Sequence, residues 1–123
     1  MRPGMTMNRS CAQTIAERDA KSRLIALQLE YSLVERNIER EHVPAAQELG
    51  IGICPWSPLA SGFLSGKYSR INQASATEGR LNVLKDSGNP AFEKFTERNW
   101  RIVDVLVEVA KELNRTPAEV ALN

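Results

Sequence analysis

Two short apolar runs, joined by a segment with helical periodicity, dominate the hydrophobic pattern of this chain. Residues 24–29 (LIALQL) and 51–54 (IGIC) are almost continuously apolar, which is typical of strands that are buried on both faces. Residues 38–49 between them form a helical pattern that ends at Gly50, because glycine takes the left-handed conformation that closes helices at low cost. Pro44 predicts a kink in this helix or a delayed start.

Prolines mark the end of the second apolar run. Pro55 and Pro58 are expected to terminate the strand, because proline cannot donate a hydrogen bond to a neighbouring strand. The resulting order of strand, helix and strand predicts an α/β fold with two parallel strands.

Gln28 is the one polar residue in the first apolar run, residues 24–29. On a buried strand its amide needs hydrogen-bond partners, which by pattern alone are neighbouring backbone groups or water.

The C-terminal half is predicted to be helical after a long polar segment. Residues 69–89 are rich in Ser, Asn and Gly without sustained periodicity, and we expect a long loop of the kind that covers active sites. Asn89 and Pro90 predict the start of the longest helix, which runs to about residue 113. A capping box over residues 116–119 begins another helix. The predicted apolar face of the long helix comprises Phe92, Phe95, Trp100, Val103, Val107, Ala110 and Leu113.

The N-terminal segment shows no periodic pattern. Residues 1–10 are expected to form an irregular lead, after which Ser10 and Gln13 give a capping-box pattern. A short helix over residues 11–21 is predicted to follow. We therefore expect residues 11–123 to form the folded domain.

Composition and charge narrow the function classes. The 123 residues include 16 Lys and Arg and 15 Asp and Glu, and this balance argues against nucleic acid or an acidic membrane as a partner. Hydrophobic residues make up 42% and charged residues 25%, as in globular proteins. No apolar run approaches the roughly 18 residues of a membrane helix, and the N-terminus lacks the apolar core of a signal peptide. We expect a soluble, cytoplasmic protein.

Metal-ligating and triad residues are scarce in this sequence. Cys11 and Cys54 lack the spacing of metal ligands, and both are expected to be reduced thiols. His42 is the single histidine, so neither a histidine-based metal site nor a local triad can be assembled. Because His42 lies among charged residues, we expect it on the surface, and we expect no metal cofactor.

The stretch over residues 50–68 carries the candidate chemistry. Trp56 lies where the second strand ends, and the loop after it contains Gly62, Gly66 and Lys67. The indole ring offers a stacking face, and backbone amides together with Lys67 offer partners for phosphates, so a nucleotide cofactor is one interpretation. The other interpretation is that Trp56 is a core residue and the loop is a connection.

Two motifs of this chain resemble those of the aldo-keto reductases. The segment WSPLASGFLSGKY, residues 56–68, resembles the family's seventh strand and following loop, most closely in the branch of bacterial general oxidoreductases and potassium-channel β-subunits. The segment QLEYSLVER, residues 28–36, resembles the sixth-strand segment at the expected distance upstream. The resemblance implies a partial (β/α)8 TIM barrel over residues 11–123, truncated at both ends, with two of the eight parallel strands.

The resemblance also implies part of an NADP(H) pocket. Gln28 would bind the carboxamide of the nicotinamide, and Trp56 would stack on its ring. Arg80 resembles a family arginine that approaches the cofactor's phosphates, and a solvated loop cation is an equal alternative. The residues that would line the phosphate path are Ser57, Pro58, Leu59, Ala60, Gly62 and Lys67.

The implied reaction is hydride transfer between NADPH and a small aldehyde or ketone, with a tyrosine as proton donor. The family's catalytic tyrosine, aspartate, lysine and histidine belong to the first half of the barrel, for which we find no counterpart here. Tyr31 and Tyr68 belong to the two motifs already named and are not assigned as proton donors. We therefore assign no catalytic residue and expect the chain to be inactive alone. Two alternatives are a non-catalytic module that self-associates or docks on a partner, and a truncated pseudogene product.

Overall fold

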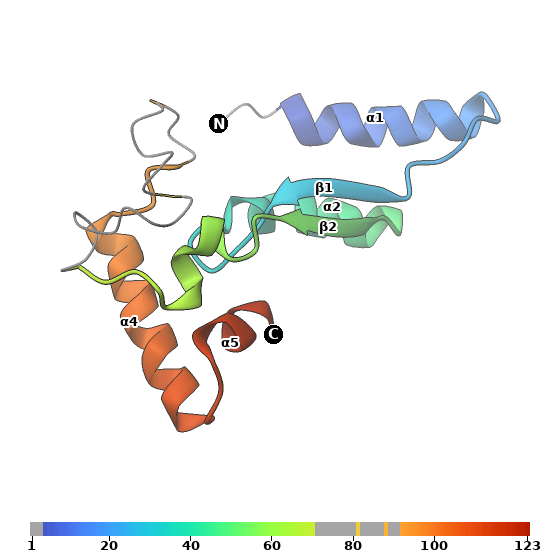
Figure 1. Cartoon of the computed structure of the whole chain (residues 1–123). Helices are drawn as coiled ribbons and strands as arrows, with labels where there is room; N and C mark the ends of the chain where they lie inside the picture. The colour runs from blue at the N-terminus through green and yellow to red at the C-terminus, as the bar shows by residue number, and fades with distance from the viewer. Residues whose placement is uncertain (1–3, 71–80, 82–87, 89–91) are drawn as a thin grey trace. The chain divides into compact units, whose positions relative to one another are not determined.

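The chain forms two compact units that alternate along the sequence. The computed structural model describes residues 4–70, 81, 88 and 92–123, with side chains from residue 11 onward. The first unit comprises the chain up to Tyr31 and Arg36–Trp56, and the second comprises Ser32–Glu35 and the chain from Ser57 onward. The elements in order are α1 (Gly4–Arg18), β1 (Ala26–Glu30), the 3-10 helix η1 (Asn37–Arg40), α2 (His42–Leu49), β2 (Gly52–Trp56), the 3-10 helix η2 (Ala60–Ser65), α4 (Glu97–Glu112) and α5 (Pro117–Leu122) (Figure 1).

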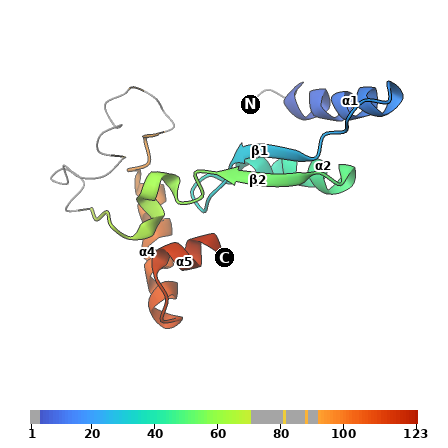
Figure 2. The ribbon, with the colours of Figure 1, turned by 45° about the vertical axis from the view of Figure 1, so that its right-hand side comes forward.

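The two strands are parallel, as predicted. The register pairs Ala26 with Gly52 and continues to Glu30 opposite Trp56. Helix α2 lies on one face of the pair in both ribbon views (Figures 1 and 2). A small cluster forms this contact, with Leu27, Ala46 and Ile51 buried and Leu29, Leu49 and Ile53 packed against them.

The prediction that both strands are buried on both faces is wrong for the described residues. In β1 only Leu27 is buried, and every residue of β2 is exposed or half-buried. The physical reason is that α2 covers one face of a sheet whose described part has two strands. None of the described elements covers the opposite face, where Ala26, Cys54 and Trp56 are exposed.

Pro55 does not end the second strand, contrary to the prediction, because β2 continues through it to Trp56. The Gly52 N–H donates to the Ile25 carbonyl over 2.9 Å, and the Trp56 carbonyl accepts from the Tyr31 N–H at 3.4 Å. In a parallel ladder every second residue faces the partner strand, so Gly52, Cys54 and Trp56 bond to β1. Pro55 faces away from β1, and its missing N–H removes no ladder hydrogen bond.

Helix α2 ends as predicted and begins slightly differently. Gly50 closes it with φ of +62°, and the Ile51 N–H donates to the Ala46 carbonyl at 2.8 Å. Residues 37–40 form the separate 3-10 helix η1, so α2 begins at His42. Pro44 lies in the first turn of α2, where its missing N–H costs no intrahelical bond. The predicted delayed start is therefore confirmed.

Helix α1 replaces the predicted irregular lead. It begins at Gly4 and ends at Arg18, so Ser10 lies inside the helix and does not cap it. No proline follows Pro3 in this segment, so nothing interrupts the helical backbone. Gln13 is buried, and its Oε1 accepts from the Leu24 N–H at 2.9 Å. This bond joins α1 to the chain that enters β1.

The long helix α4 begins later than predicted. Residues 93–96 are not helical, and Thr96 is the N-cap, with its hydroxyl accepting from the Asn99 N–H at 3.2 Å. The helix begins after Thr96 and not at the predicted Asn89 and Pro90, because the Thr96 side chain provides the hydrogen bond that a helix N–H needs at the first turn. The predicted starting residues Asn89 and Pro90 lie outside the described residues, as do 71–80 and 82–87 of the predicted loop.

The second capping box is confirmed. The Thr116 hydroxyl accepts from the Glu119 N–H at 3.3 Å, and the Glu119 carboxylate accepts from the Thr116 N–H at 2.7 Å. Between the two helices Asn114 takes a φ of +51°, and the Arg115 N–H donates to the Ala110 carbonyl at 2.9 Å. This pair of features closes α4 as left-handed caps commonly do.

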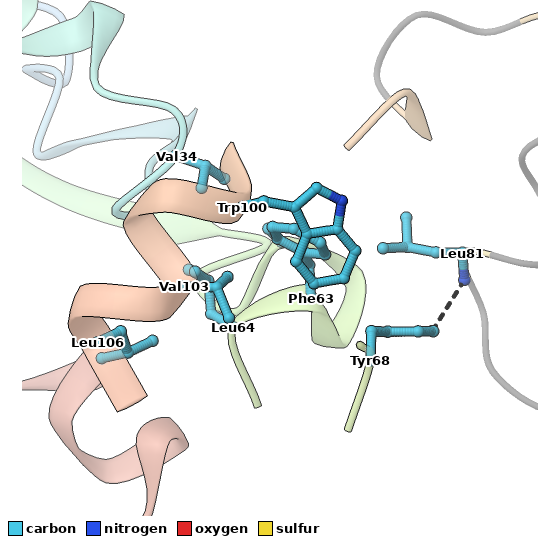
Figure 3. Packing of buried hydrophobic residues seen from close by; sticks show 9 residues of the cluster. Val34, Phe63, Leu64, Tyr68, Leu81, Trp100, Val103 and Leu106 are labelled. Atoms are coloured by element: carbon cyan, nitrogen blue, oxygen red, sulfur yellow. Dashed lines mark hydrogen bonds between the residues drawn. The ribbon is translucent and has the colours of Figure 1, made fainter. Parts of the chain in front are cut away.

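The core of the second unit is aromatic (Figure 3). The Phe63 and Trp100 ring centroids are 4.8 Å apart in an edge-on arrangement, and the Tyr68 hydroxyl accepts from the Leu81 N–H at 3.3 Å. Leu113 does not join this core, contrary to the predicted helix face, because α4 ends there and 59% of the residue is exposed. The buried members are Val34, Ala60, Phe63, Leu64, Tyr68, Leu81, Trp100, Val103 and Leu106.

Candidate functional site

Gln28 and Trp56 lie on the face of the sheet that α2 leaves uncovered. Side chains alternate along a strand, and Leu27 and Leu29 point into the cluster under α2. Gln28 therefore points to the opposite face, together with its partner Cys54 and with Trp56 two residues further on. Gln28 is exposed, so its amide does not need the buried partners expected from the sequence. Within the described chain its amide has no hydrogen-bond partner.

Trp56 is not a core residue. It ends β2, and 45% of its surface is exposed. Its backbone carbonyl is fixed by the Tyr31 N–H, so the strand end is held while the ring is accessible. An exposed indole at the carboxyl end of a parallel strand is suited to stacking against a flat ligand. This excludes the interpretation of Trp56 as core.

The loop after Trp56 has an unusual backbone that closes on itself. Ser57, Ala60 and Ser61 have positive φ angles of 55°, 48° and 57°, and Gly62 has φ of 88°. The Ala60 N–H donates to the Ser57 carbonyl at 2.8 Å, and the Ser61 N–H donates to the Ser57 hydroxyl oxygen at 3.3 Å. The Gly62 N–H donates to the Leu59 carbonyl at 2.9 Å. These amides are therefore already used inside the loop.

The donors left to this loop are side chains. Because the Ser57 oxygen accepts from Ser61, its hydroxyl hydrogen is directed elsewhere and can donate to another acceptor. Lys67 is exposed, and its Nζ lies 5.1 Å from the centroid of the Tyr68 ring. A Cβ added at Gly62 would lie 2.9 Å from both Cε and Nζ of Lys67. The absence of a side chain at Gly62 thus makes room for the ammonium group over the loop backbone.

The remaining predicted residues differ in accessibility. Pro58 is exposed and Leu59 is half-buried, so both can contact a ligand. Ala60 is completely buried in the aromatic core, so its side chain supports the loop from inside. Arg80 lies outside the described residues. The structure brings Ser57, Gly62 and Lys67 into one loop, and it places Gln28 and Trp56 on one sheet face.

His42 is less exposed than the sequence suggested. It is half-buried at the start of α2, and both ring nitrogens are shielded from solvent without a hydrogen-bond partner among the described residues. The expectation of a surface histidine is therefore wrong for the ring nitrogens. No role in the candidate site follows from this position.

Three side chains form a hydrogen-bonded network just after the end of β1. The Tyr31 hydroxyl donates to Glu39 Oε1 at 2.7 Å, and Arg36 donates to both carboxylate oxygens of Glu39 at 2.7 and 3.0 Å. The bond from Arg36, followed by that from Tyr31, lowers the pKa of Glu39. The bond to Glu39 and burial raise the pKa of Tyr31. Sequence reasoning missed this network, although the three-residue spacing of Arg36 and Glu39 was an available signal.

The described residues contain no group of three or more His, Cys, Asp or Glu side chains placed to hold a metal ion. Among the helices whose residues the structure describes, none combines the length and the apolar character needed to cross a membrane.

Comparison with known proteins identifies the family. The model of the aldo/keto reductase family matches residues 7–123. The chain is 37% identical to the uncharacterized oxidoreductase YrpG of Bacillus subtilis (strain 168) over 111 residues, which are 90% of this chain and 30% of that protein. It is 36% identical to the probable aldo-keto reductase 1 of Glycine max over 117 residues, 94% of this chain and 32% of that protein.

A third relative is named for a different role. The chain is 35% identical over 99 residues to the probable voltage-gated potassium channel subunit beta of Oryza sativa subsp. japonica, covering 80% of this chain and 29% of that protein. The chain thus spans about 30% of the length of the curated relatives that it matches. These matches confirm the family that the motifs over residues 28–36 and 56–68 predicted.

Proposed function

The chain belongs to the aldo/keto reductase family, and we propose that its first unit holds the nicotinamide of NADP(H) in such an oxidoreductase. The observation that carries the proposal is the uncovered sheet face on which Gln28 and Trp56 lie together. An exposed amide beside an exposed indole offers both contacts that a nicotinamide requires. The amide can exchange hydrogen bonds with the carboxamide, and the indole can stack on the ring.

By family resemblance alone, we propose separately that the loop that begins at Ser57, in the second unit, supplies contacts to the cofactor's phosphates. Its own amides at residues 60–62 are used internally, so the Ser57 hydroxyl and the Lys67 ammonium are the donors for phosphate oxygens. Pro58 and Leu59 give apolar contact along the path of the cofactor. Arg80 is proposed as a further phosphate contact by family resemblance alone.

When bound, the nicotinamide cofactor supplies the hydride that reduces an aldehyde or a ketone. The residues of this chain bind and orient the cofactor, and we assign none of them to proton transfer. The Tyr31 hydroxyl already donates to Glu39, so it is not available as a proton donor to a substrate. We propose that the chain alone is inactive, that its setting is cytoplasmic, and that the carbonyl substrate binds to parts of the family fold beyond these residues.

A calorimetric titration of the purified chain with NADPH tests the proposal. We expect saturable binding that Gln28→Ala weakens by about five- to tenfold, as for the loss of one hydrogen-bonded group. The control is Leu29→Ala, the neighbouring residue on the face under α2, which removes apolar packing without touching the proposed pocket. Equal affinity of the wild type and Gln28→Ala, with both chains folded, would contradict the proposed pocket.

A second candidate function is a non-catalytic interaction module. The uncovered sheet face and the similarity to a protein named as a channel β-subunit favour it. Cofactor titration separates the two candidates, because an interaction module without a cofactor would show no saturable heat with NADPH. Reduction of a carbonyl by the 123-residue chain would contradict both.

A further inference from the structure

The hydrogen bond from the Tyr31 N–H to the Trp56 carbonyl fixes the backbone at the end of β2, and it is long. It measures 3.4 Å, whereas the bond at the other end of the strand pair, from the Gly52 N–H to the Ile25 carbonyl, measures 2.9 Å. Backbone hydrogen bonds usually measure about 2.7 to 3.2 Å. Beyond Trp56 the chain leaves the strand at once, because Ser57 takes a φ of +55°. The bond that holds the Trp56 backbone is therefore weak by itself.

The side chain of Tyr31 is fixed at its far end. Its hydroxyl donates to Glu39 Oε1 at 2.7 Å, a short bond to a carboxylate. Tyr31 is thus held at two points, to Trp56 through its N–H and to Glu39 through its phenol. Because the ring between these points is rigid, a movement of the Tyr31 backbone away from Trp56 also strains the bond to Glu39.

Glu39 has a fixed position of its own. Arg36 Nε donates to Oε1 of Glu39 at 2.7 Å, and Nη2 donates to Oε2 at 3.0 Å. Two such charge-assisted bonds fix the orientation of a carboxylate. The backbone of Glu39 belongs to η1, in which its N–H donates to the Arg36 carbonyl at 3.1 Å and the neighbouring Ile38 is buried. The acceptor for the Tyr31 hydroxyl is therefore held by both its side-chain and its backbone contacts.

We propose that Glu39, oriented by Arg36, is a positioning residue that acts through Tyr31 to hold the Trp56 backbone and thereby sets where the exposed indole lies. All four residues belong to the first unit. The inference rests on the proposed function for the use of the indole, namely stacking on the nicotinamide. An aromatic ring that is already fixed binds a flat ligand more tightly, because less ordering is needed on binding.

Native-state amide hydrogen exchange, followed by NMR without cofactor, tests the positioning. Glu39→Ala removes the acceptor for the Tyr31 hydroxyl and leaves the sequence around residue 31 unchanged, so the intrinsic exchange rate of that amide is unchanged. We expect the Tyr31 amide to exchange about fivefold faster or more, as for the loss of one supporting hydrogen bond. The Gly52 amide should exchange as in the wild type. Tyr31→Phe, which removes the hydroxyl instead, should accelerate the amide of residue 31 to a similar extent.

Two control variants separate the hydrogen bond from charge. Glu39→Gln keeps an oxygen that can accept from Tyr31 and Arg36, so exchange of the Tyr31 amide should be close to that of the wild type. Glu48→Ala removes an exposed carboxylate from α2 in the same unit and should not change it. The proposal is overturned if Glu39→Ala leaves the Tyr31 amide unchanged, accelerates the Tyr31 and Gly52 amides equally, or has the same effect as Glu39→Gln.

Calorimetric titration with NADPH tests the consequence for the cofactor. We expect Glu39→Ala to lower the affinity by about threefold or more, because a less ordered indole stacks less well, and Glu39→Gln to change it little. A folded wild type that does not bind NADPH would contradict the proposed function, whatever the exchange rates are. Binding by the wild type with equal affinity in Glu39→Ala would instead overturn the positioning role.

Discussion

Gln28 and Trp56 lie on the same face of the parallel β1–β2 pair, because the register pairs Gln28 with Cys54 and Glu30 with Trp56. Both side chains are exposed on the face opposite α2. The indole lies at the carboxyl end of β2, the end at which open α/β sheets bind ligands, and the amide lies on the neighbouring strand opposite Cys54, two residues before Trp56. The proposed nicotinamide contacts depend on this one relationship within the first unit.

Loss of the Lys67 ammonium should weaken NADPH binding. We expect Lys67→Ala to lower the affinity by about tenfold at low salt, because a charge-assisted contact to phosphate is lost. The decrease should shrink as the salt concentration rises, since exposed charges are screened. Titration at two ionic strengths measures this. Lys111→Ala, which removes an exposed cation from the last turn of α4, is the control and should leave the affinity unchanged. An equal loss in both variants would show a general charge effect.

The Tyr31–Glu39 hydrogen bond should make stability depend on pH in two directions. The folded-state pKa of Glu39 is lowered, so its contribution is present above the unfolded pKa and is lost as the pH falls through the folded pKa. The folded-state pKa of Tyr31 is raised, so its contribution is present below the unfolded pKa and is lost as the pH rises through the folded pKa.

Urea denaturation of the wild type and Tyr31→Phe measures this dependence. The difference between their free energies of unfolding should be largest near neutral pH. It should decrease below about pH 4 and above about pH 10, the ordinary ranges of the two groups. A difference that stays constant across this range would show that the phenol contributes only by packing.

Gly66 should resist substitution for two separable reasons. Its φ is +81°, and an alanine there would cost about 1–2 kcal/mol from the left-handed conformation alone. An added Cβ would also lie 3.0 Å from Pro117 Cγ, at the start of α5. We expect Gly66→Ala to destabilise the second unit, and Pro117→Ala to relieve the steric part without relieving the strain.

A double-mutant cycle over Gly66→Ala and Pro117→Ala isolates the contact. The destabilisation by Gly66→Ala should be smaller in the Pro117→Ala background than in the wild type. Additive effects would mean that the proline does not contact the loop, and that only the backbone conformation requires glycine at this position.

The elements that were predicted correctly from the sequence are those that depend on residues close together along the chain. The parallel strands, the helix closed by Gly50 and the capping box at Thr116 were predicted and are confirmed. Each depends on local chemistry, such as an apolar run, a left-handed glycine or a reciprocal hydrogen bond. The family was also predicted from its two motifs, and the comparisons confirm it.

The errors have a common physical origin in tertiary context. The burial of the strands was overestimated because an apolar run reports what can be buried, whereas the covering elements decide what is buried. The direction in which Pro55 faces depends on the register, which the sequence does not specify. The start of α4 was placed too early because Phe92 and Phe95 continue the apolar spacing into residues that are not helical. The internal bonding of the loop after Trp56 was not predictable, since it requires four residues with positive φ.

The most direct test of the central claim is tryptophan fluorescence during titration with NADPH. The chain has two tryptophans: Trp56 is 45% exposed and Trp100 is 5% exposed in the aromatic core. We predict saturable quenching in the wild type, and an affinity in Trp56→Ala, measured by calorimetric titration because this variant lacks the reporting indole, that is lower by about tenfold or more, as expected when an aromatic stacking contact is lost. Trp100 reports in both proteins that the second unit is folded. Binding of equal affinity in the wild type and Trp56→Ala, or no saturable quenching in the folded wild type, would contradict the account.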